Sequence, residues 1–443
     1  MRIVVRALAL SLALAPFAAP AQDSVFPGGI LGSGSRFRLR AELKANYRDS
    51  AFDSLTVGGT GLPFAVVLST PSADRSIELS NVALTVESDL TTGIFAKAVV
   101  HIGDLYNRNP TSSDDRIALR EAFVRFGKKL ESLQSQKQNG GLYVQAGKFP
   151  RFTKQIVRRM ESYGLWGTAV GRLEEVGLEA GGTLGSVFYF RAAAGNGNPV
   201  FLRDVNALAG DNGTPERQVG STTAPVYGSG FPILYDTKSN DVSFSGRFQY
   251  GGGLGMRFNF GDRDRDGIDI LGWYYTRKME ACSRIRGTSY CGDLGILDAF
   301  TKRLPFEGDK KKEWGVNADM RFGPVHFYAQ YVKQEIANLP RKGYEAEASY
   351  RLPLNGLFAS GDTSLFNWIE PVVRYSKIDN DFANTPGYPA PSVTWDWTKL
   401  DYGVRIGVMR GVDVTVEWTK QDAKAAARTL HPDEFLTTLR ASF

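Results

Sequence analysis

The sequence predicts an all-β protein, a transmembrane antiparallel β-barrel of 16 strands with 18 as the alternative count. The composition is the first indication, because 48 glycines and 52 aromatic residues (27 Phe, 18 Tyr and 7 Trp) accompany only 42% hydrophobic residues in 443. Beyond the N-terminal leader there is no uninterrupted apolar run of 18 residues, the length a spanning helix needs. Many segments instead alternate apolar and polar residues with period two, the pattern of strands.

The N-terminal leader has the features of a secretory signal peptide. Arg2 and Arg6 precede the apolar run 7–15, and Ala19-Pro20-Ala21 forms a small-x-small cleavage site. We therefore expect residues 1–21 to be a signal peptide and residues 22–443 a single barrel domain. Removing the two leader arginines lowers the formal net charge from +6 to +4. The remaining basic residues are interspersed with acidic ones, whereas nucleic-acid binders cluster them, so no nucleic-acid partner is expected.

The alternation is clearest at 36–44, where Phe37, Leu39, Ala41 and Leu43 share one face and charged residues share the other. The longest case is 244–260, in which the phase holds for 17 residues. The same pattern recurs at 314–322, 344–350, 402–408 and 412–418. Charges on one face and apolar or aromatic residues on the other are typical of strands between lipid and a watery lumen.

The connections predict the strand count. Short links occur at 90–93, 184–186, 323–324 and 410–411, and long ones at 49–74, 151–171, 198–239, 279–311 and 379–398. Outer-membrane barrels have an even number of strands, short periplasmic turns and long extracellular loops. Short and long links alternate consistently around a closed barrel of 16 strands if 244–260 is one strand and 261–267 is a periplasmic turn. The final segment, 434–443, alternates and ends in Phe443, which resembles the assembly signal of outer-membrane barrels.

Four stretches resemble the phosphate-selective porin O/P family: 120–126 (REAFVRF), 146–152 (AGKFPRF), 189–196 (YFRAAAGN) and 369–375 (IEPVVRY). The resemblance implies a bacterial outer-membrane protein, a homotrimer in which each barrel has a loop folded into its pore. It implies passive diffusion of small hydrophilic solutes with a preference for anions such as phosphate. The surroundings would be outer-membrane lipid and lipopolysaccharide, and no cofactor is expected.

The connection 151–171 is the candidate constriction loop. Arg151, Lys154, Arg158 and Arg159 fall within nine residues. If a short helix begins at Thr153, residues 151, 154 and 158 form a basic stripe, while Ile156, Met160 and Tyr163 form an apolar one that holds the barrel wall. Basic residues at a narrow point of a pore favour anions. The alternative is a solvated outer loop whose charges contact lipopolysaccharide.

The predicted lumen faces carry thirteen basic and eight acidic residues, and the excess of five predicts a weak anion preference. Any single arginine is expected to form an ion pair along the lumen wall. The basic candidates are Arg36, Arg38, Arg40, Lys44, Lys97, Arg125, Arg247, Arg257, Arg321, Arg351, Arg374, Arg405 and Arg440.

Two minor candidates lie in connections. Asp262, Asp264 and Asp266 before Gly267 match the first half of a calcium loop, but position twelve is Trp273 where a bidentate Glu is required, so an ordinary charged turn is favoured. Cys282 and Cys291 are expected to form a disulfide enclosing eight residues, the alternative being two free thiols.

A passive channel rather than an enzyme is the expected function. The three histidines, His101, His326 and His431, are isolated in sequence and match no zinc-ligand spacing, so neither catalytic nor metal-binding residues are assigned. Two alternatives remain open. One is a barrel hydrolase acting at the membrane rim, which needs a histidine beside a nucleophile, and the other is a structural or adhesive barrel with a plugged lumen.

Overall fold

The computed structural model describes residues 36–50, 54–57, 66–69, 76–102, 117–129, 141–155, 157–166, 174–196, 226–229, 248–260, 266–278, 310–336, 339–354, 358–360, 363–380, 396–424, 429–431 and 433–443. The predicted signal peptide, residues 244–247, Arg247, Cys282 and Cys291 lie outside these ranges.

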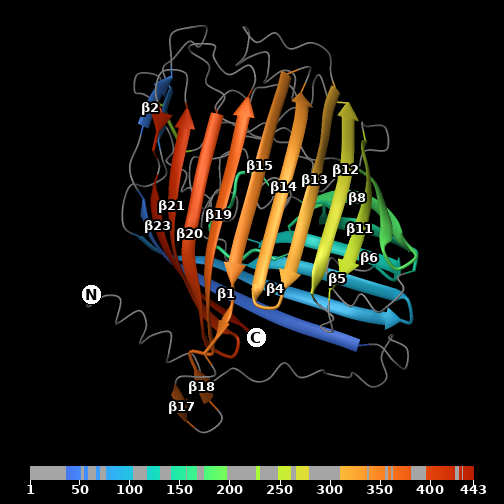
Figure 1. Cartoon of the computed structure of the whole chain (residues 1–443), viewed down its shortest axis with the longest axis horizontal. Helices are drawn as coiled ribbons and strands as arrows, with labels where there is room; N and C mark the ends of the chain where they lie inside the picture. Colours follow the sequence, from blue (N-terminus) through green and yellow to red (C-terminus); the bar gives the residue numbers. More distant parts are fainter. Residues whose placement is uncertain are drawn as a thin grey trace.

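Sixteen long strands in the described part of the chain form one antiparallel sheet (Figure 1). They are β1 (Arg36–Ser50), β4 (Ser76–Thr91), β5 (Ile94–Ile102), β6 (Ile117–Gly127), β7 (Tyr143–Pro150), β8 (Glu174–Leu184), β9 (Phe188–Gly195), β11 (Gln249–Asn259), β12 (Gly267–Lys278), β13 (Lys310–Phe322), β14 (Val325–Ile336), β15 (Leu339–Tyr350), β19 (Trp368–Asn380), β20 (Asp396–Met409), β21 (Val412–Lys424) and β23 (Glu434–Ser442). Two short pieces join the same sheet, β16 (Leu352–Pro353) and β22 (Thr429–Leu430).

Each long strand pairs with the next one along the chain, and the last pairs with the first. Glu42 of β1 lies opposite Ser442 of β23, and Ser50 lies opposite Glu434. The sheet is therefore a closed barrel without an exposed edge. This confirms the prediction of 16 strands over the alternative of 18. The final strand, with Phe443 directly after it, is the one that closes the barrel.

Short turns gather at one end of the barrel, called here the turn end. They are residues 92–93, 185–187, 323–324 and 410–411, as the sequence predicts. The link between β11 and β12 also lies at this end, since Asn259 pairs with Gly267. The longer link between β15 and β19 carries a small hairpin, β17 (Phe358–Ser360) and β18 (Thr363–Leu365), which hangs below the barrel in Figure 1.

At the opposite end, called the loop end, Ile336 of β14 pairs with Leu339 of β15, so only residues 337–338 separate these two strands. A three-stranded sheet also forms from parts of the long connections: β2 (Ser54–Val57), β3 (Val66–Ser69) and β10 (Val226–Ser229).

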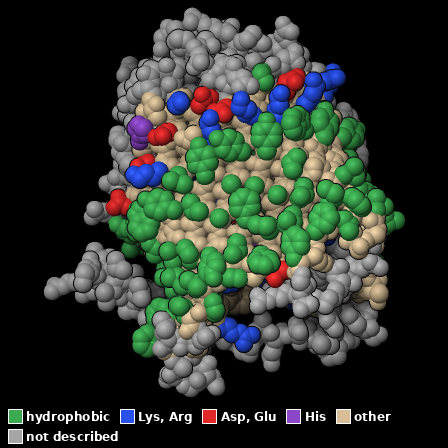
Figure 2. All heavy atoms as spheres, viewed as in Figure 1, with side chains coloured by type: hydrophobic (Ala, Val, Ile, Leu, Met, Phe, Trp, Pro, Cys, Tyr) green, Lys and Arg blue, Asp and Glu red, His purple; other side chains and the backbone are tan. Residues whose placement is uncertain are grey.

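The two faces of the barrel wall differ in polarity. Figure 2 shows a broad apolar belt on the outside, with charged side chains concentrated above it. Exposed large hydrophobic residues such as Tyr274, Trp314 and Trp418 belong to this belt, whereas Glu347, Arg374 and Asp401 are fully buried inside. An apolar exterior and a polar interior are what lipid outside and water inside require. No helix among the described residues is long and apolar enough to cross a membrane.

The segment 151–166, called here the inner segment, lies inside the barrel. The predicted helix beginning at Thr153 is wrong, because residues 151–155 and 157–166 form turns and bends. The physical reason is that side chains of the wall take up the backbone groups that a helix would pair internally: the carbonyl of Ser162 accepts from Arg374, and the amide of Ser162 donates to Glu417.

Candidate functional site: the lumen and its inner segment

Carboxylates and a hydroxyl of the wall hold the backbone amides of the inner segment. Glu417 on β21 accepts from the amides of Glu161 (3.2 Å) and Ser162 (2.8 Å). Glu345 on β15 accepts from the amide of Trp166 at 3.1 Å. The Ser376 hydroxyl on β19 accepts from the amide of Leu165 at 3.1 Å, so three strands bind one stretch of six residues.

Donors of the wall bind the carbonyls of the same segment. Arg374 donates to the carbonyl of Ser162 at 2.6 Å, and Lys399 donates to that of Tyr163. Nearer the start of the segment, Asn317 donates to the carbonyl of Thr153 at 2.9 Å. Every one of these wall residues belongs to β13 or to the strands from β15 to β21. The backbone of the inner segment is therefore held by these strands, while its side chains also reach β1 and β8.

Arg151 anchors the start of the inner segment and is itself buried, with 4% exposure. It forms ion pairs with Glu313 (3.2 Å) and Glu175 (3.5 Å), and its guanidinium lies 3.8 Å from the centre of the Tyr275 ring. Burial disfavours the charged guanidinium, but Glu313, Tyr275 and Glu175 together outweigh burial and raise the pKa of Arg151. It therefore stays charged while joining β8, β12 and β13.

The other three predicted constriction residues also lie in the lumen, in three different settings. Arg159 is buried against Glu370 (2.8 Å) and Glu347 (3.6 Å) of the wall. Arg158 pairs with Glu161 of its own segment at 3.1 Å. Lys154 is the most exposed, at 32% of its side chain, and approaches Glu121 at 3.7 Å. The predicted single basic stripe is therefore not formed. Of the four residues, only Arg151 and Lys154 line the open cavity described below.

Of the predicted apolar stripe, Ile156 lies outside the described residues, and Met160 and Tyr163 are buried, at 1% and 6% exposure. Trp166, which the sequence analysis did not single out, is also buried at 1% and packs over Gly343, where an added Cβ would lie 2.9 Å from the ring. The close approach explains why β15 has glycine at that point.

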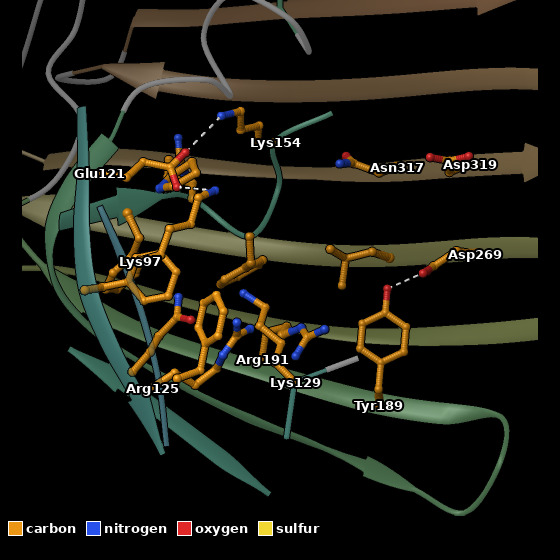
Figure 3. A pocket seen from close by; sticks show the side chains of 18 of the residues that line it. Lys97, Glu121, Arg125, Lys129, Lys154, Tyr189, Arg191, Asp269, Asn317 and Asp319 are labelled. Carbon is orange, nitrogen blue, oxygen red and sulfur yellow. Dashed lines mark hydrogen bonds and ion pairs between the residues drawn. The ribbon is translucent and has the colours of Figure 1, made fainter. Parts of the chain in front are cut away.

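The side of the lumen that the inner segment leaves free contains a cavity of about 620 Å³ (Figure 3). Among the described residues, nine basic and four acidic side chains line it, an excess of five positive charges. The basic ones are Arg38, Arg40, Lys97, Arg125, Lys129, Arg151, Lys154, Arg191 and Arg257, and the acidic ones are Glu87, Glu121, Asp269 and Asp319. A concentration of one charge sign within low-dielectric walls raises the local concentration of oppositely charged solutes.

Several of these charges pair with each other across the cavity wall. Glu121 lies between Lys97 (2.9 Å) and Lys154, as the dashed lines of Figure 3 show. Arg257 pairs with Asp269 at 2.9 Å. Lys129 and Arg191 both lie over the ring of Tyr143, at 5.3 Å and 5.0 Å from its centre. Lys129 also pairs with the buried Glu179 at 2.8 Å, so Glu179 offsets part of the positive charge at this point of the wall.

The predicted lumen arginines and lysines divide into two groups. Arg38, Arg40 and Arg257 line the cavity. Lys44, Arg374 and Arg405 are buried in ion pairs away from it, with Glu161 (3.2 Å), Asp401 (2.8 Å) and Asp413 (3.4 Å) respectively. The side chain of Arg36 and the whole of Arg247 lie outside the part of the chain that the structure describes.

Two kinds of cavity residue were not predicted from the sequence. Lys129 and Arg191 were not counted, although Arg191 continues the phase of Tyr189 on β9. The phenylalanines Phe95, Phe123 and Phe149 were also overlooked, because inward faces were identified by their charges alone. Their alternation with Lys97 and Arg125 is visible in the sequence and was the available signal.

The remaining candidates show no metal site or catalytic arrangement. Asp262 and Asp264 lie outside the described residues, and Asp266 accepts from the amide of Gly323 at 3.1 Å, a contact between two turns. Within the described ranges no group of three or more potential ligands could hold a metal ion. His326 contacts Asp319 at 2.8 Å and lies opposite Ser349, whose hydroxyl donates to Glu370.

No protein-family model matches the sequence, and no curated protein matches it, so the resemblance to the phosphate-selective family is not confirmed. Solved structures do match. The outer membrane channel DcaP of Acinetobacter baumannii has a TM-score of 0.51 at 8% identity, covering 95% of this chain and 100% of that one. OmpF of Salmonella typhi, in complex with daunomycin, has a TM-score of 0.50 at 12% identity, covering 93% and 98%. The chain therefore has the fold of the outer-membrane porins and is a β-barrel protein of the outer membrane.

Proposed function

We propose that the protein is a porin through which small hydrophilic solutes diffuse passively, with a preference for anions. The observation that supports this most directly is the cavity beside the inner segment, with its excess of five positive charges. A solute entering a narrow pore loses part of its hydration, and basic side chains replace it for anions but not for cations. Oxyanions such as phosphate suit this lining, because arginine and lysine side chains donate charge-assisted hydrogen bonds to phosphate oxygens.

Planar-bilayer recording with the purified protein tests this function. A salt gradient gives the sign of selectivity, and phosphate added at constant ionic strength tests for block of the small-anion current. We expect stepwise conductance, a reversal potential on the anion side and block by phosphate. Absence of conducting steps would contradict the channel, and a reversal potential on the cation side would contradict its anion preference.

The barrel hydrolase has no support from the described residues. The contact between His326 and Asp319 resembles two thirds of a catalytic triad. The neighbouring serine, Ser349, donates its hydroxyl to Glu370 at 3.0 Å, and the second ring nitrogen of His326 has no hydrogen-bond partner within the described ranges, so the serine–histidine pair of a triad is not formed there. We propose that these residues are part of the lumen wall and that the protein is not an enzyme.

We also propose a homotrimer that assembles through the outer face of β5 to β9. The strands β4 to β9 themselves contain two tyrosines, Tyr143 and Tyr189, and no tryptophan among their described residues. Both tyrosines are buried on the lumen side. The outer face there includes a group of small residues, beside larger apolar ones such as Phe126, Leu178 and Phe188: Ala96, Ala98, Ala122, Val124, Ala146, Ala180, Gly182, Ala192 and Ala194. Elsewhere the outer face carries Tyr and Trp, which anchor a barrel at the lipid–water interface. A face that has small residues and lacks such anchors suits protein contact rather than lipid.

Lipopolysaccharide is the proposed partner of the rim above the apolar belt. Outward lysines cluster at the loop end of β12 to β15, where Lys278 lies opposite Lys310 and Lys333 lies opposite Lys342. A cluster of lysines at the rim produces a positive surface potential, which attracts the phosphate groups of the outer leaflet. Measuring lipopolysaccharide co-purification with wild type and with a Lys333→Gln, Lys342→Gln variant tests the contact, which equal retention would exclude.

A further inference from the structure

Two strands of the cavity wall place phenyl rings and cations in alternation. On the lumen side of β5 and β6, Phe95 lies opposite Arg125 and Lys97 lies opposite Phe123. All four side chains line the cavity. Each ring therefore has a cation directly across the strand pair, and each cation has a ring.

The rings continue as a row onto β7. The centres of Phe95 and Phe123 are 6.1 Å apart, and those of Phe123 and Phe149 are 6.0 Å apart. The guanidinium of Arg125 lies 4.6 Å from the centre of Phe95 and 5.7 Å from that of Phe123. These separations are within the usual range of aromatic and cation–π contacts. The row is thus an ordered surface of rings with charge at its edge.

Phenyl rings on this side of the wall need a physical explanation. The lumen face of a porin strand is in contact with water, and exposed apolar surface costs free energy in proportion to its area. Phe95 and Phe123 are both half-buried and line the cavity, so part of their ring surface faces it even though Arg125 lies over Phe95. Inorganic anions have no apolar surface to bury against such rings. A solute with its own apolar surface gains free energy by burying it there.

We propose that the cavity binds organic anions that carry an aromatic ring, such as aromatic carboxylates. This proposal rests on the proposed function, because it names the class of anion that the channel selects. Side chains opposite each other on paired antiparallel strands have Cβ atoms about 4.5–5.5 Å apart. An aromatic carboxylate stacked on Phe123 can therefore place its ring on the phenyl row and its carboxylate against Lys97 or Arg125.

The inner segment adds a ring and a cation to the lining of this cavity. Phe152 lines it and stacks on Tyr275 with ring centres 5.0 Å apart. Lys154 shares Glu121 with Lys97 (Figure 3) and therefore adds its charge close to the phenyl row.

The test compares benzoate with acetate as blockers of chloride current in planar bilayers. Both carry one carboxylate, and only benzoate has a ring. Aromatic pairs contribute enough to change affinity by a factor of about 2 to 10. We expect benzoate to block wild type at a concentration about tenfold lower than acetate does. Phe123→Leu, which stays apolar but loses the ring, should raise the half-blocking concentration of benzoate about fivefold and leave that of acetate unchanged.

Phe126→Leu is the matched control, because Phe126 lies on the same strand, β6, but is 53% exposed on the outer face. The half-blocking concentration of benzoate for Phe126→Leu should equal that for wild type. A second variant, Phe95→Leu, repeats the test if Phe123→Leu does not fold. Two results would overturn the proposal: equal block of wild type by benzoate and acetate, or equal benzoate block of Phe123→Leu and Phe126→Leu. If the reversal potential is on the anion side in that case, the proposed function as an anion-preferring channel still holds. A cation-side reversal potential would instead contradict the proposed function itself.

Discussion

Arg374 is an example of a lumen arginine that stabilises the wall and the inner segment. Its side chain has no exposed surface, and it binds Asp401 (2.8 Å), Glu347 (3.4 Å) and the carbonyl of Ser162. A buried ion of this kind contributes through the groups it neutralises, so removing it leaves carboxylates without their partner. Cavity residues such as Lys154 differ, because their charge remains available to a solute.

Replacing Arg374 is therefore expected to destabilise the barrel. Arg374→Met should lower the free energy of unfolding by about 3–5 kcal/mol, the usual cost of breaking a buried ion pair. Urea unfolding of the detergent-solubilised protein, followed by tryptophan fluorescence, measures it. In the control, Arg38→Met, the arginine side chain is 41% exposed and 3.7 Å from Glu87, so about 0–1 kcal/mol is expected. A loss as small in Arg374→Met would contradict the assigned role.

Lys154 tests the opposite role. Lys154→Glu reverses a charge that faces the cavity next to Glu121, so the reversal potential in a salt gradient should move toward cations, with little change in stability. Lys312→Glu is the control, since Lys312 pairs with Glu335 on the outer rim, away from the lumen. If the two variants shift the potential equally, Lys154 does not act on the permeating ion.

Strands and inner segment differ in how far their sequences predict them. A strand such as β12 is specified by its own alternation, which is local and visible in twelve residues. The inner segment owes its shape to partners far along the chain, for example Ser162 to Glu417, 255 residues away. Helical periodicity was the only local guide, and it predicted a helix that is absent. Long-range hydrogen bonds of this kind have no signature in a single sequence.

Those wall contacts predict a change in channel behaviour when they are removed. Glu417→Leu deletes the acceptor for the amides of Glu161 and Ser162, so this part of the inner segment should detach from β21. We expect higher open-channel noise and a variable single-channel conductance in bilayer recordings. Glu335→Leu removes a carboxylate of the outer rim and serves as the control. Wild-type noise in Glu417→Leu would show that the other contacts suffice.

At the scale of the whole barrel, the sequence predicts number, order and closure of the strands well. Alternation and short turns at 92–93 or 323–324 are local signals, and an even strand number constrains the remainder. The tight link between β14 and β15 was not predicted, because Ala337 and Asn338 form no distinctive turn motif. The side of the lumen that stays open could not be predicted from the sequence either, because it depends on the position of the inner segment.

The outer face provides the prediction for the assembled molecule. Ala146→Trp places a large ring at the centre of the small-residue face, between Val124 and Leu178, where a neighbouring subunit would have to make room. Overpacking a close contact is destabilising, so the oligomer should dissociate to monomers in light scattering of the detergent-solubilised protein. Ala346→Trp makes the same change beside Tyr375 in the aromatic part of the outer face, where lipid accommodates the ring and the oligomer should persist. If both variants keep the wild-type mass, the small-residue face is not the subunit contact; if both lose it, the effect of tryptophan is not specific to that face.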